Sequence, residues 1–216
     1  MILTLMTMNL RYAEAKDGEH CWDNRRSIMA EMLNEYHPDI FGVQEGLRPQ
    51  VDYLIENLPG YACFGEGRDG LDKSEHTAIF YNIHRLHCLE GHTFWLSETP
   101  EIAGSKSWGS SLSRLATLGR FRIKASGVPL CLCNTHFDHR SEMARQQSAR
   151  LMWSHLKEKQ EFTFLMGDFN CTEQSFAWQY LTGSDELKIG EKGDFKDVWH
   201  SAEKKINPVS TLHDYK

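Results

Sequence analysis

The chain has 216 residues, of which 25% are charged and 40% are hydrophobic, as in a globular protein of one large domain. The formal net charge of -6 at pH 7 argues against a protein that binds nucleic acid mainly through a diffuse positive field. It does not exclude an enzyme that grips phosphate locally through a metal ion.

The amino-terminal part of the chain alternates between strand and helix patterns. After a first strand, Asp23 or Asn24 is expected to cap a helix that ends before Pro38. The apolar face expected for this helix comprises Ile28, Met29, Met32, Leu33 and Tyr36. Strands are expected over residues 2–10, 39–45, 61–64 and 77–81, a second helix over 49–58 and a surface loop over 65–74.

The rest of the chain continues the same alternation without a linker, a repeat or a low-complexity segment, so a single domain is expected. A long helix over residues 141–159 should bury one face, and a short helix should pass through Phe176, Trp178 and Leu181. Strands are expected over residues 83–95, 114–124 and 128–136, with a Gly/Ser-rich loop over 104–113. Residues 162–166 should form a buried strand that runs into Gly167 and presents Asp168 and Asn170 at its carboxyl end.

One of these strands raises the alternative of a zinc protein. His84, His87, Cys88 and His92 lie close together in the sequence. However, this run lacks the two well-separated ligand pairs of common structural zinc sites. We therefore expect a strand with exposed histidines, and the absence of zinc from the purified protein would exclude the alternative.

The cysteines and the start of the chain indicate the cellular compartment. The six cysteines have no paired spacing, and Cys131 and Cys133 fall in an apolar run expected in the core. The start lacks the features of a signal peptide, and no apolar run is long enough to cross a bilayer. These features predict a reduced, cytoplasmic protein with no obligate protein partner evident.

Four of the expected strands finish in polar side chains. Any one of them could be explained by the turn that follows a strand. Strand ends of layered folds often meet in one pocket, however, and oxygen ligands with one or two carboxylates suit Mg²⁺ or Mn²⁺. The polar residues at these ends are Asn9, Glu45, Asn134 with His136, and Asp168 with Asn170.

The chemistry of these residue types suggests a role for each. Glu45 would be the main metal ligand, with Asn9 as a neutral helper. His136 would hydrogen-bond a phosphate oxygen as negative charge builds in the transition state. Asp168 would orient or deprotonate the attacking water, and Asn170 would fix its position.

The same segments resemble, in order, the motifs of the endonuclease/exonuclease/phosphatase superfamily. They read Met-Asn-Leu-Arg at 8–11, Gln-Glu at 44–45, Asn-Thr-His at 134–136 and Gly-Asp-Phe-Asn at 167–170. The superfamily includes DNase I-like nucleases, deadenylases, inositol-phosphate phosphatases and neutral sphingomyelinases. Each motif alone is weak, but four in family order make a specific match that covers essentially the whole chain.

The resemblance implies both a fold and a reaction. The fold is a DNase I-like, four-layered α/β sandwich: two facing mixed, mostly antiparallel sheets flanked by helices. The reaction is Mg²⁺- or Mn²⁺-dependent attack of water on a phosphodiester or, as the lesser alternative, a phosphomonoester. The substrate would be a small molecule or a nucleic acid, and a basic tract that would favour long nucleic acid is absent.

A bacterial subgroup of metal-dependent hydrolases shows a closer resemblance around Trp108 and the Arg-Leu-Ala-Thr run at 114–117. By that resemblance Arg114 helps to grip a phosphate, and Asn134 joins it as a substrate-binding candidate. An exposed strand arginine is the alternative for Arg114.

The chain departs from the family pattern at its end. The family continues with an Arg-Ile-Asp strand and a Ser-Asp-His motif, and neither precedes Lys216. His213-Asp214 has the wrong order and is expected in a terminal loop. We therefore expect residues 1–216 to be one incomplete domain, with an exposed sheet edge and without one catalytic His. A truncated relative that binds a ligand without catalysis is the alternative function.

Overall fold

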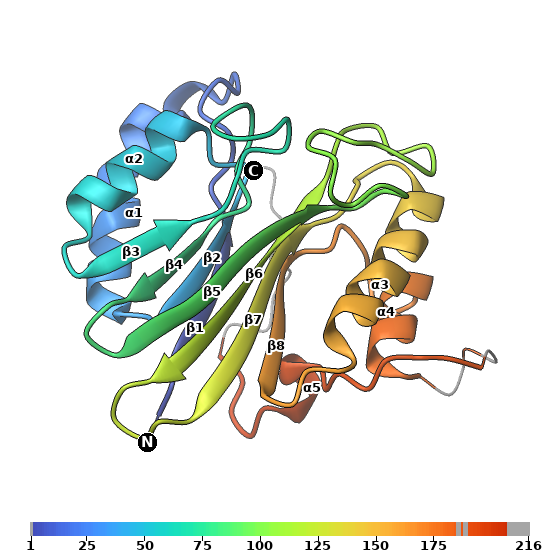
Figure 1. Ribbon diagram of the computed structural model, residues 1–216. Helices are drawn as coiled ribbons and strands as arrows, with labels where there is room; N and C mark the ends of the chain where they lie inside the picture. The colour runs from blue at the N-terminus through green and yellow to red at the C-terminus, as the bar shows by residue number, and fades with distance from the viewer. Residues whose placement is uncertain (1, 185–186, 188–189, 207–216) are drawn as a thin grey trace.

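The computed structural model describes residues 2–184, 187 and 190–206, which fold into two β-sheets and the helices that flank them (Figure 1). The strands are β1 (Leu5–Asn9), β2 (Ile40–Gln44), β3 (Tyr61–Phe64), β4 (Ile79–Asn82), β5 (Leu86–Trp95), β6 (Leu115–Ile123), β7 (Pro129–His136) and β8 (Phe162–Asp168). The helices are α1 (Trp22–Tyr36), α2 (Arg48–Asn57), α3 (Glu142–Leu156), α4 (Phe176–Thr182) and α5 (Val198–Ser201), with a 3-10 turn η1 (Gly18–His20).

Two four-stranded sheets face each other. Their strand orders are β1-β2-β4-β3 and β5-β6-β7-β8. The pairs β1–β2 and β7–β8 are parallel and the other four pairs are antiparallel, so both sheets are mixed. Figure 1 shows α1 and α2 on the outer face of the first sheet and α3 and α4 on the outer face of the second. The four-layered sandwich implied by the family resemblance is confirmed.

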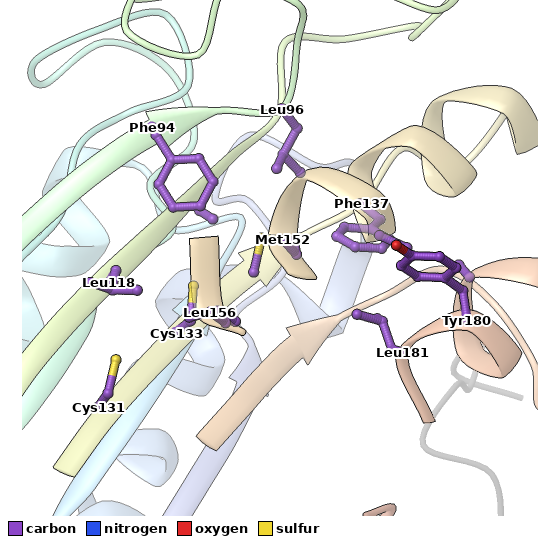
Figure 2. Close-up of a cluster of buried hydrophobic side chains, with 13 residues drawn as sticks. Phe94, Leu96, Leu118, Cys131, Cys133, Phe137, Met152, Leu156, Tyr180 and Leu181 are labelled. Carbon is purple, nitrogen blue, oxygen red and sulfur yellow. The ribbon is translucent and has the colours of Figure 1, made fainter. Parts of the chain in front are cut away.

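Three apolar clusters hold the four layers together. The middle cluster fills the space between the sheets with residues such as Ile40, Ile79 and Phe121. A second cluster packs α1 and α2 on the first sheet, where the rings of Phe41 and Phe80 stack at 4.6 Å. The third packs α3 and α4 on the second sheet; Figure 2 shows its members Phe94, Leu96, Leu118, Cys131, Cys133, Phe137, Met152, Leu156, Tyr180 and Leu181. Burial of Cys131 and Cys133 confirms their expected place in the core.

Helix α1 differs from the sequence-based expectation in its start and its buried face. Its N-cap is Cys21, and Asp23 lies within the first turn. Trp22 is buried because it packs edge-on against Tyr53 of α2, with ring centroids 5.9 Å apart. With Trp22 packed in this way, only part of the expected apolar face of α1 is buried. Ile28, which was expected to be buried, is 63% exposed.

Strand β8 is only half-buried, whereas a buried strand was expected. Among the described residues it pairs with β7 alone, just as β1 pairs with β2 alone. An apolar groove of about 610 Å³ runs along these two strands, between them and α4. Phe162, at the start of β8, is 72% exposed.

None of the helices in the described ranges combines the length and the apolar character needed to cross a membrane. The expected histidine-rich strand is β5, on which His87 is exposed. No group of three or more His, Cys, Asp or Glu side chains within the described ranges is arranged to hold a metal ion. The sequence-based alternative of a zinc site on this strand therefore gains no support from its geometry.

A buried amide joins the two sheets. Asn134 of β7 is fully buried, and its Nδ2 donates to the carbonyl oxygens of Val43 at 3.0 Å and Ala78 at 2.9 Å. Its Oδ1 accepts from Gln44 Nε2 at 2.7 Å. A Cβ added to Gly42 would lie 2.5 Å from the Asn134 amide, so glycine leaves the room that this amide occupies. We call this set of contacts the Asn134 clamp.

Replacing Asn134 with leucine should destabilise the fold. The change keeps the side-chain size but removes a buried donor from the carbonyl groups of Val43 and Ala78 and a buried acceptor from the Gln44 amide. We expect a loss of roughly 3 kcal/mol in the free energy of unfolding, measured by urea denaturation. Asn57→Leu, which alters an exposed residue of α2, is the matched control and should cost less than about 1 kcal/mol. Equal effects of the two substitutions would contradict the clamp.

Candidate active site

Four of the predicted residues meet at one end of the sandwich. The two parallel pairs, β1–β2 and β7–β8, bring their carboxyl ends to the same edge, and His136 lies opposite Asp168 in the register. Asn9 Nδ2 donates to Glu45 Oε1 at 2.8 Å and to Asp168 Oδ2 at 3.1 Å. His136 Nε2 lies 3.8 Å from the same Asp168 oxygen. One amide thus bridges a carboxylate from each sheet.

Asn170 holds the carboxylate of Asp168 in place through a backbone hydrogen bond. Its backbone N–H donates to Asp168 Oδ1 at 3.0 Å, and its side-chain Nδ2 donates to the carbonyl of Phe137 at 3.0 Å. The preceding Gly167 has φ 140°, and a Cβ there would lie 2.0 Å from the carbonyl oxygen of Thr135. Only glycine fits this approach of β8 to β7, so the Gly-Asp-Phe-Asn motif has a steric basis.

The backbone around the site is strained. Arg11, Glu45 and Asn170 adopt positive φ values of 56°, 61° and 47°. Asparagine tolerates this region, but for Glu45 it costs roughly 1 kcal/mol or more. Contacts hold Glu45 in place: its Oε2 accepts from the Tyr12 N–H at 3.3 Å and its Oε1 accepts from Asn9. Strain concentrated on a carboxylate at a strand end is typical of a functional site.

The two carboxylates of the site lie close to one amide and one imidazole. Within the described ranges, neither Glu45 nor Asp168 forms an ion pair with a lysine or an arginine. Two half-buried carboxylates held together by a neutral amide fit a hard divalent cation that keeps several of its waters. The oxygen of Asn9 accepts from the Arg11 N–H at 2.8 Å. In this arrangement Asn9 orients the carboxylates, and its direct contact with a metal stays an untested prediction.

A buried arginine stands behind His136. Arg114 is only 6% exposed, so the alternative of an exposed strand arginine is wrong. Its Nη1 lies 2.9 Å from His136 Nδ1, and its Nη2 lies 3.3 Å from His139 Nδ1. Glu75 Oε2 lies 3.9 Å from Arg114 Nη1 and accepts from Arg68 Nη1 at 2.7 Å.

Burial and charge set the protonation state of this layer. Burial, and then the positive charge of Arg114, holds the pKa of His136 well below its ordinary value. His136 is therefore neutral at neutral pH. Burial also raises the pKa of Glu75 and lowers the pKa of Arg114.

Asp138 anchors a loop beside the site and was missed by the sequence-based reasoning. It is 1% exposed, and its carboxylate joins the segment that follows His136 to the loop over residues 104–113. The hydrogen bond from the Arg140 N–H forms a local turn, which an aspartate in a sequence can indicate. The partners in the loop are distant in the sequence, so the sequence alone does not reveal them. Asp138 Oδ1 accepts from the N–H groups of Arg140 and Ser141, and Oδ2 accepts from Ser110 Oγ, Ser111 N and Oγ, and Leu112 N.

The remaining candidates lie elsewhere. Asn134 is enclosed in the clamp between the sheets, and this position favours a structural role over the substrate contact expected for it. Trp108, at the expected loop, has φ 55°, and its carbonyl accepts from Ser141 Oγ at 3.0 Å. Figure 1 shows this loop and the loop over residues 65–74 at the same end of the sandwich. His213-Asp214 lies outside the described residues.

Comparison with known proteins gives clear neighbours. A crystal structure of an endonuclease/exonuclease/phosphatase from Bacteroides vulgatus is 34% identical, with a TM-score of 0.81 over 85% of this chain and 71% of that one. A mannosyl-6-phosphatase from Bacteroides thetaiotaomicron is 38% identical, with a TM-score of 0.77 over 82% of this chain and 70% of that one. No family model matches the chain.

A curated relative is more distant. The uncharacterized protein L388 of Acanthamoeba polyphaga mimivirus is 28% identical over 165 residues, which are 71% of this chain. The chain spans 60% of the length of that relative.

Replacing Asp138 with asparagine should loosen the 104–113 loop. Burial alone would raise the pKa of Asp138, but hydrogen bonds from Ser111, Ser141, Arg140 and Ser110 hold it well below its ordinary value. The stabilisation is therefore fully present above the unfolded-state pKa of about 3.9 and is lost as the pH falls through the lower folded-state pKa. We expect Asp138→Asn to cost roughly 2 kcal/mol at pH 7, measured by urea denaturation.

As the pH falls below about 4, the difference in stability between the two proteins should shrink, because the unfolded chain takes up a proton at Asp138 before the folded protein does. Asp23→Asn, at an exposed position of α1, is the control and should change the free energy of unfolding by less than about 0.5 kcal/mol. A difference between wild type and Asp138→Asn that grows as the pH falls would contradict this account.

Proposed function

Because the chain belongs to the endonuclease/exonuclease/phosphatase family, we propose that it is a metal-dependent phosphoesterase that acts at the Asn9, Glu45, His136 and Asp168 cluster. The observation that carries the proposal is the Asn9 amide that holds one carboxylate from each sheet, at 2.8 and 3.1 Å. A fold that needed only stability would gain little from two adjacent carboxylates without an arginine or lysine partner.

The residues present fit Mg²⁺ or Mn²⁺. Glu45 would hold the ion, because its carboxylate is aimed by a strained backbone and by the Asn9 and Tyr12 donors. The bound ion would supply a Lewis acid that polarises a phosphoryl oxygen.

The protein side chains then have distinct tasks. His136 is neutral, and a proton on Nε2 lets it donate to a phosphoryl oxygen as negative charge builds there. Asp168 accepts a hydrogen bond from the attacking water, orients it and receives its proton. Asn170 holds Asp168 Oδ1 through its backbone N–H, which leaves Oδ2 for this work.

Two substrate classes follow from different observations. The sequence motifs favour a phosphodiester. The 38% identity to a mannosyl-6-phosphatase favours a sugar phosphate monoester. The net charge of -6 favours a small phosphoester over long nucleic acid in either case.

Glu45→Gln should remove metal-dependent turnover. The amide keeps the size of the side chain but lacks the negative charge that would hold the ion, so we expect a loss of at least about 100-fold. The measurement is the initial rate over a Mg²⁺ titration, with mannose 6-phosphate and a dinucleotide as the two substrates. Glu56→Gln, on the exposed face of α2, is the matched control and should keep the full rate.

Unchanged turnover in Glu45→Gln would remove Glu45 from the proposed metal site. If the wild-type protein binds a phosphoester but turns over neither substrate at any Mg²⁺ concentration, the non-catalytic binding module becomes the better description. Calorimetric titration of the wild-type protein with each substrate provides that binding measurement.

A further inference from the structure

We propose that Arg114 is a positioning residue: its guanidinium fixes His136 as a hydrogen-bond donor at Nε2 and does not itself grip the substrate. The proposal deepens the function proposed above and rests on it for the role of His136 in catalysis. The tautomer that it assigns to His136 can be measured without any activity.

The position of Arg114 argues against direct contact with a substrate. It directly precedes β6, where its carbonyl accepts from the Leu96 N–H at 2.7 Å, and the residue is 6% exposed. Both terminal nitrogens of its guanidinium are directed at imidazole rings. Little of the Arg114 surface is therefore left for a phosphate to contact.

The chemistry of the two side chains allows only one arrangement of protons. A guanidinium carries hydrogen-bond donors and no acceptor, and it does not lose its proton in proteins. At 2.9 Å from Arg114 Nη1, the His136 Nδ1 must therefore be the acceptor. A neutral imidazole has one proton, so that proton lies on Nε2. This is the nitrogen that lies 3.8 Å from Asp168 Oδ2, on the side of the reacting groups.

The surroundings hold the guanidinium in this position. Glu75 lies 3.9 Å from Nη1 and is shared with Arg68, which contacts the same oxygen at 2.7 Å. His139 Nδ1 lies 3.3 Å from Nη2, and by the same argument it accepts. Nε is buried and has no hydrogen-bond partner among the residues that the structure describes. An arginine kept in such a place at the cost of an unsatisfied donor has a task that a smaller residue cannot perform.

The first test is the tautomer of His136 in the wild-type protein. Nitrogen-15 NMR of histidine-labelled protein at neutral pH distinguishes a proton on Nε2 from a proton on Nδ1. We expect a single tautomer with the proton on Nε2 for His136. A proton on Nδ1, or a mixture of both tautomers, would overturn the proposal whether or not the protein is an enzyme.

The second test compares substitutions of Arg114. Arg114→Met should produce a mixture of His136 tautomers and lower kcat by roughly 10- to 100-fold, while KM changes less than about threefold. Arg114→Lys places an ammonium group there, which can donate a hydrogen bond but cannot accept one. This variant should therefore retain the Nε2 tautomer of His136 and recover part of kcat. Arg122→Met, at an exposed position of β6, is the control and should change neither the tautomer of His136 nor kcat.

The outcomes separate the two roles of Arg114. A rise in KM with kcat unchanged would assign Arg114 to direct phosphate binding and overturn the positioning role. If Arg114→Met does not fold, Arg114→Lys decides: loss of the single tautomer in that variant would also overturn the proposal. Wild-type protein that shows the Nε2 tautomer but hydrolyses no phosphoester would refute the proposed function alone.

Discussion

The Asn134 clamp is the contact on which the arrangement of the molecule depends. Apolar packing between two sheets resists separation, but it allows the sheets to slide, since it has little directional preference. The amide of Asn134 is directional, because it can form its hydrogen bonds with Val43, Ala78 and Gln44 in only one relative placement of the sheets. Gln44 directly precedes Glu45, and Asn134 lies two residues before His136, so this buried node also sets the spacing of the site.

Beyond the Asn134 clamp, the candidate site arranges its charged and polar groups in a definite order. The carboxylates of Glu45 and Asp168 have no arginine or lysine partner in the described ranges, whereas Arg68 pairs with Glu75 and Arg114 contacts His136. Burial, and then the positive charge of Arg114, lowers the pKa of His136 and keeps it neutral. Asp138 then fixes the neighbouring loop through backbone and hydroxyl donors. Arg114 and Asp138 thus hold the parts of the candidate site that they contact, His136 and the 104–113 loop.

The sequence was sufficient to predict the strands and the residues at their ends, because period-two apolar patterns and strand-end polar residues are local signals. It was not sufficient for Arg114, whose burial depends on the distant partners Glu75 and His139. The buried face of α1 was also misjudged, since the contact between Trp22 and Tyr53 decides the orientation of that helix. Asn134 was correctly noticed, but only the packing of two sheets shows that it faces inward.

The side-chain hydrogen bond between Asn9 and Asp168 joins residues that are 159 positions apart in the sequence. During synthesis on the ribosome, the first sheet can form long before the strand that carries Asp168 has emerged. Glu45 and Asp168 therefore cannot meet until most of the chain is available, and long-range closure is slow. A nascent chain therefore carries no assembled pair of carboxylates until β8 has emerged and paired with β7.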